Sequence, residues 1–108
     1  MINLKGNRME VQFKPGLTEY MEKTGKRYIM VEVIQTQNSD FDVTEICPRF
    51  VSEKFAVSLK EKKHYRAVPA PIGEVLMPPY RLEIDPVVTF ELKSFLVFKW
   101  IRQEGINL

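Results

Sequence analysis

Residues 88–100 read VTFELKSFLVFKW, the most regular stretch of the chain. Six of its seven even-numbered positions are apolar and Ser94 is the exception, whereas the odd-numbered positions from 89 to 93 are polar. Because side chains alternate between the two faces of a strand, this pattern predicts one continuous apolar face built from the even positions. It predicts two strands, or one long bent strand with a break near Ser94.

Two apolar residues, Phe95 and Val97, stand on the otherwise polar odd-numbered face. Their position indicates that this face is covered as well in the second half of the stretch. A chain of about 100 residues buries only a modest core of its own. A homodimer that hides Phe95, Val97 and Ile101 is therefore our hypothesis for this cover.

The N-terminal third switches between the period of a strand and that of a helix. Residues 9–13 alternate as in a strand, and residues 27–36, RYIMVEVIQT, predict a strand that is apolar on both faces and therefore central. Between them, Pro15 and Gly25 bracket an amphipathic helix whose apolar residues recur at helical spacing from Leu17. We expect this helix to cover the central strand.

The middle of the chain is less regular. Residues 50–60 fit both an alternating strand and a helix with a spacing of four, and we favour the strand. Residues 73–77 predict a short edge strand. The sequence therefore predicts an α+β fold of mostly β-strands with one amphipathic helix near the N-terminus, as a single domain over residues 1–108.

The composition argues against several classes of protein. With 44% apolar and 28% charged residues, the chain is not a disordered tail, and a net charge of +2 does not indicate nucleic acid. The start of the sequence lacks the apolar core of a secretory signal, and its longest apolar runs fall far short of the roughly 20 residues that span a bilayer. One cysteine cannot form an internal disulfide. We expect a cytoplasmic protein with no membrane partner.

Few side chains offer chemistry. Cys47 follows a polar loop whose carboxylates, Asp40 and Asp42 among them, we interpret as solvated rather than as a calcium site. We interpret Cys47 as a small half-buried residue; the alternative is a thiolate, activated by Arg49, that ligates a metal shared between two copies. His64 is interpreted as a surface residue. We predict no catalytic residue and no bound cofactor.

A basic segment at residues 60–66 surrounds an aromatic ring with positive charge. Its candidate residues for binding an anionic partner or nucleic acid are Lys60, Lys62, Lys63, Tyr65 and Arg66. Glu61 offsets part of the charge, and no recognised nucleic-acid motif surrounds the segment. A solvated turn is therefore the favoured interpretation, and nucleic acid is not the expected partner.

The C-terminal segment resembles that of a known family. Residues 90–108 read FELKSFLVFKWIRQEGINL, which is similar to the closing strands of the small HesB-like proteins of the CC/Se motif family, relatives of the A-type iron–sulfur carriers. Residues 73–77, GEVLM, resemble the short strand before that family's final hairpin. The order of strand, helix and strand over residues 9–36 is similar to its opening. The resemblance implies a small HesB-like domain.

The functional cysteines of that family have no counterpart here. The family's cysteine pair would follow the strand that ends near Thr36, where this chain has QNSD at residues 37–40, and the C-terminal Cys-x-Cys of the A-type carriers is absent. We therefore predict a non-enzymatic binding or structural module with an unidentified protein partner. The alternatives are metal or iron–sulfur handling through Cys47 shared across a dimer, and anionic-partner or nucleic-acid binding through residues 60–66.

Overall fold

The structure is a computed structural model that describes residues 9–37 and 42–107. In chain order its elements are β1 (Glu10–Phe13), α1 (Pro15–Thr24), β2 (Tyr28–Gln37), β3 (Asp42–Val51), α2 (Glu53–Lys62), β4 (Arg66–Pro69), β5 (Glu74–Met77), β6 (Glu83–Phe95) and β7 (Phe98–Asn107). Strands dominate, with helices packed against them. The α+β class predicted from the sequence is confirmed.

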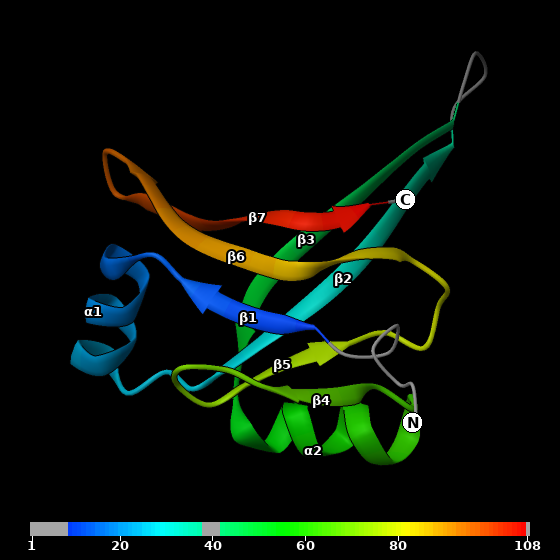
Figure 1. Ribbon diagram of the computed structural model, residues 1–108, viewed down its shortest axis with the longest axis horizontal. Coiled ribbons are helices and arrows are strands. Elements are labelled where there is room, and N and C mark those ends of the chain that lie inside the picture. Colours follow the sequence, from blue (N-terminus) through cyan, green and yellow to red (C-terminus); the bar gives the residue numbers. More distant parts are fainter. Residues whose placement is uncertain (1–8, 38–41, 108) are drawn as a thin grey trace.

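The strands form two mixed sheets (Figure 1). In the three-stranded sheet, the order is β1-β6-β7, with β1 parallel and β7 antiparallel to β6. The four-stranded sheet has the order β3-β2-β5-β4, with β5 parallel and β3 antiparallel to β2. The central position predicted for residues 27–36 is confirmed in β2. The prediction of an edge strand at residues 73–77 was wrong, because β5 lies between β2 and β4 and its Val75, Leu76 and Met77 are buried.

Three layers result from this arrangement. The main core lies between the two sheets, and its fully buried members come from both sheets and from α1; they include Leu17, Ile29, Val31, Val75, Val88 and Phe90. A second cluster joins α2 to the opposite face of the four-stranded sheet, through Met30, Ala56, Leu59 and Leu76. Consecutive residues of β2 therefore enter different cores, because strand side chains alternate between faces.

The N-terminal helix forms where the sequence predicts it. It begins at Pro15 and ends at Gly25, whose φ of +77° favours glycine and whose N–H donates to the carbonyl of Met21 at 2.8 Å. Its buried residues, Leu17 and Met21, join the core between the sheets and pack beside β6. The expected role as cover of the central strand falls instead to α2.

The preference for a strand over residues 50–60 was wrong from Glu53 onwards, where α2 begins, although Phe50 and Val51 are the last residues of β3. The count of one helix was wrong as well. Ser52 caps α2, since its Oγ accepts a hydrogen bond from the N–H of Phe55 at 3.1 Å. Ala56 and Leu59, three residues apart, face the sheet. The alternating pattern arose from Phe55 and Val57, and both of these are exposed.

Candidate functional site

The end of the β6–β7 hairpin carries the most unusual surface of the described residues. Two residues, Leu96 and Val97, join the strands, and Phe95 pairs with Phe98 across the ladder. The structure therefore has two strands rather than one bent strand. The sequence predicted a break near Ser94, and the turn begins two residues after it.

The parity of the core-facing residues changes across this turn. In β6 the even-numbered positions face the core, and Phe90 is fully buried. In the part of β7 that follows the turn, the core residue is the odd-numbered Ile101, which pairs with Leu92 and is 5% exposed. The even-numbered Ile106 is buried too, beyond a shift in register between Ile84 and Thr89. Phe98 and Trp100 therefore lie outside, contrary to the continuous apolar face predicted. Ile101 is hidden by its own chain, so it needs no second copy to cover it.

The result is an apolar surface that we call the tip. Its five side chains are between 49% and 87% exposed: Phe95, Leu96, Val97, Phe98 and Trp100. At roughly 150–250 Å² for a large side chain, these fractions amount to roughly 500–900 Å² of exposed apolar surface. The largest such patch on an ordinary monomer covers roughly 300–600 Å². The tip lies at the end of the molecule that α1 occupies (Figure 1).

A ladder of aromatic rings and lysines holds the base of this hairpin against the body. Lys99 Nζ lies 5.9 Å from the ring centroid of Tyr20 in α1, and this ring is 5.7 Å from that of Phe50 in β3. Lys26 Nζ lies 5.4 Å from the centroid of the Phe50 ring. The Lys99 contact joins β7 to α1, and the ammonium groups of Lys99 and Lys26 both lie at the surface.

Cys47 lies in β3, opposite Glu32 of β2, and is half-buried. It lines a cleft of about 320 Å³ between β3 and β7, together with residues that include Trp100. Burial raises the pKa of its thiol above the ordinary value of 9.0, and the carboxylates of Glu45 and Glu32 raise it further, whereas Arg49 lowers it. Arg49 is itself paired with Glu32, with Nε 3.3 Å from Oε1. The thiol therefore stays protonated at neutral pH, which argues against an activated thiolate.

The surroundings of Cys47 offer little to a metal ion. Across residues 9–37 and 42–107, no three His, Cys, Asp or Glu side chains gather closely enough to hold one. Asp40 lies outside the described residues, and Asp42 is the first residue of β3. A metal at Cys47 would need ligands from a second copy or from solvent, and that hypothesis stays a prediction.

The basic segment is divided by the fold. Lys60 pairs with Glu74 of β5, with Nζ 3.4 Å from Oε1. Lys62 and Lys63 lie at the C-terminal end of α2, where their positive charge interacts favourably with the helix dipole. Tyr65 is half-buried beside the cluster under α2, and this burial raises the pKa of its phenol. Its ring therefore serves packing and is not a free platform for a base.

Arg66, in β4, and His64, in the preceding turn, are both exposed. His64 has a φ of +61°, and this turn directs Tyr65 back so that its N–H reaches the carbonyl of Leu59 at 3.1 Å. The surface position predicted for His64 is confirmed. The use of this segment by an anionic partner stays a prediction.

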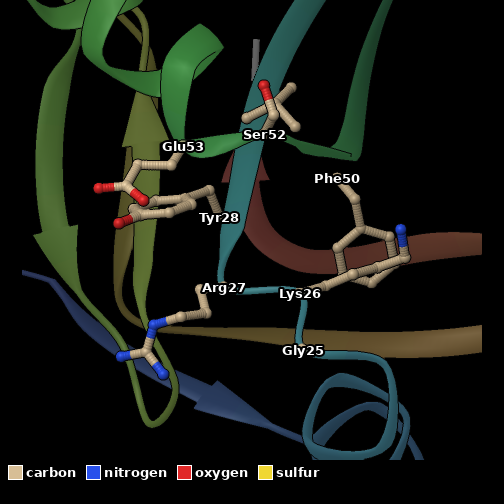
Figure 2. A pocket seen from close by; sticks show the side chains of 8 residues that line it. Gly25, Lys26, Arg27, Tyr28, Phe50, Ser52 and Glu53 are labelled. Atoms are coloured by element: carbon tan, nitrogen blue, oxygen red, sulfur yellow. The ribbon is translucent and has the colours of Figure 1, made fainter.

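A groove of about 360 Å³ lies between the start of β2 and the end of β3 (Figure 2). The sequence did not predict it. Its charged side chains diverge: Lys26 lies over Phe50, and Arg27 points the other way. Glu53 lies beside Tyr28 on the far wall. Because no polar groups converge on one point, the groove offers a ligand nothing to fix its orientation.

No known protein family, no curated protein and no solved structure matches this chain. The HesB-like resemblance therefore stays a prediction. Within the described ranges, neither helix is long and apolar enough to cross a membrane.

Proposed function

We propose that this protein is a non-enzymatic binding module, on a frame predicted to be HesB-like, and that the tip is its binding surface. The observation that carries the proposal is the exposure of five large apolar side chains in one hairpin end. Exposed apolar patches of this size mark interaction sites, because leaving them in water is unfavourable.

The remaining surface gives little support to catalysis. No polar or charged side chain in the described part of the chain is buried. An enzyme usually adjusts the pKa of an acid, base or nucleophile towards its working range. The two groups with a raised pKa here, Cys47 and Tyr65, are shifted towards the protonated form, which is the less nucleophilic one. These observations support a binding role.

The tip contributes little to folding. Phe95 and Phe98 are each 66% exposed, and Val97 is 87% exposed, so most of their surface gains nothing from the folded state. The core beneath the hairpin is built by Phe90 and Ile101 instead. Removal of the apolar tip side chains should therefore weaken binding and spare stability.

An anionic apolar dye, 8-anilinonaphthalene-1-sulfonate, tests this separation. We expect it to bind the native protein, and the variant Phe95→Ser/Phe98→Ser to lose most of that binding while its circular dichroism stays unchanged and its Tm falls by no more than roughly 10 °C. The matched control is Phe55→Ser, which removes an exposed ring (44% exposed) from α2 and should keep the dye site. Dye binding that survives in the tip variant, or a tip variant that unfolds, would contradict the proposal.

A further inference from the structure

The charged side chains on the hairpin next to the tip are basic. Between Leu92 and Gln103 the chain has three basic residues, Lys93, Lys99 and Arg102, and no acidic one. The nearest carboxylate on the hairpin is Glu91, which lies 3.8 Å from Lys93 and opposite Arg102. An apolar end with a cationic base is complementary to a surface that is apolar inside and negative at its rim.

This charge argues against a second copy as the occupant. A two-fold contact through the tip would bring Lys93, Lys99 and Arg102 of one copy towards the same residues of the other, which is unfavourable.

The order of side chains along the hairpin matches the order of environments in a lipid surface. Leu96 and Val97 form the end, and the Phe95–Phe98 pair follows. Strands advance about 3.4 Å per residue, so Trp100, three residues behind Val97, lies about 10 Å from the end. It pairs there with Lys93. Interfacial segments bury their apolar face about 5–10 Å deep, with tryptophan and lysine at the headgroups.

We propose that the tip inserts into the interfacial layer of an anionic lipid surface, with Trp100 at headgroup depth and Lys93, Lys99 and Arg102 against the negative headgroups. The inference rests on the proposed function, since it names the partner of the tip. The sequence alone predicted no membrane partner because no segment is long enough to span a bilayer. Surface insertion of a hairpin end needs no spanning segment.

Trp100 is the only tryptophan of the chain, and it is 49% exposed. Its fluorescence therefore reports the base of the tip and the adjoining cleft between β3 and β7. We expect vesicles of phosphatidylcholine with about 30% phosphatidylserine to shift its emission to the blue, to protect it from acrylamide and to carry the full chain upward in a flotation gradient. Vesicles of phosphatidylcholine alone should bind much more weakly.

Variants separate the apolar and electrostatic contributions while they keep Trp100 as the reporter. Phe95→Ser/Phe98→Ser should lower vesicle affinity at least about 100-fold, because both rings leave the apolar layer. Lys93→Gln and Lys99→Gln should each cost about fivefold, the effect of one charge near an anionic surface. The matched control, Lys62→Gln/Lys63→Gln on α2, should bind as the unchanged protein does.

Absence of binding to anionic vesicles, with tip-dependent dye binding intact, would overturn the lipid inference and leave the binding module standing. The tip would then dock on a protein with an acidic rim. Trp100 emission that depends on protein concentration, with a dimer in sedimentation equilibrium, would overturn it in favour of a second copy. Loss of the dye site as well would remove the proposed function itself.

Discussion

A pair of alanine substitutions in β7 decides which face of the hairpin lies inside. Ile101→Ala truncates a side chain that is 5% exposed, and Phe98→Ala truncates one that is 66% exposed. The predictions for the two differ because a two-residue turn places Ile101, and not Phe98, over the core. The continuous even-numbered face predicted from sequence implies the reverse order.

The magnitudes follow from burial. Replacing a buried isoleucine by alanine costs about 3 kcal/mol, through lost transfer free energy and the cavity left behind. About a third of the Phe98 surface is buried, and full burial of such a ring is worth about 3 kcal/mol, so Phe98→Ala should cost about 1 kcal/mol or less. In a domain of this size the first change lowers Tm by roughly 15 °C and the second by roughly 5 °C.

Urea unfolding followed by circular dichroism measures both free energies of unfolding, and unchanged m-values would show that the unfolded states are comparable. If Ile101→Ala leaves too little native protein to fit, Ile101→Val, which removes a single buried methylene group, should cost about 1 kcal/mol, at least as much as removal of the whole Phe98 ring. A Phe98→Ala variant that loses as much stability as Ile101→Ala would refute the register. The tip would then be part of the core, and the proposed function would fail with it.

Two further predictions concern Cys47 and Leu96. Alkylation of Cys47 by iodoacetamide should reach half its maximal rate above pH 9.0, because burial and two carboxylates raise the pKa of the thiol. Glu32→Gln removes one of these carboxylates and should move the midpoint to lower pH. A midpoint at or below pH 9.0 in the unchanged protein would contradict the electrostatics described. Leu96→Gly should raise the free energy of unfolding by about 0.5–1 kcal/mol, since Leu96 has a φ of +58° and is 80% exposed. Urea unfolding measures this change, and a variant less stable than the unchanged protein would contradict the prediction.

The parts of the fold that the sequence predicted are those in which local pattern and tertiary position agree. The helix between Pro15 and Gly25 and the central strand β2 are such parts, because caps and apolar spacing point to the same structure. α2 was missed because Phe55 and Val57 imitate a strand while both face solvent. The capping signal at Ser52 was present in the sequence, and it would have favoured the helix.

The tip could not be predicted from alternation alone, because the meaning of alternation depends on the length of the turn. In this hairpin Phe95 pairs with Phe98 and Lys93 with Trp100, so each pair joins an odd to an even position. Paired residues lie on one face. When the alternation of apolar and polar residues continues unchanged through a two-residue turn, the apolar residues of one of the two strands must therefore face outwards. That rule turns the regularity of residues 88–100 into a signal for an exposed surface.

The conformation of the turn adds an independent argument that the tip serves something other than folding. The left-handed conformation of Leu96 costs a residue with a Cβ about 1–2 kcal/mol, and glycine avoids this cost. Exposure of the leucine side chain to water is unfavourable as well. Folding would be better served by Gly or Asn at this position. Strained residues cluster at binding sites. A leucine at this position of the turn is therefore expected to contact a partner outside its own chain.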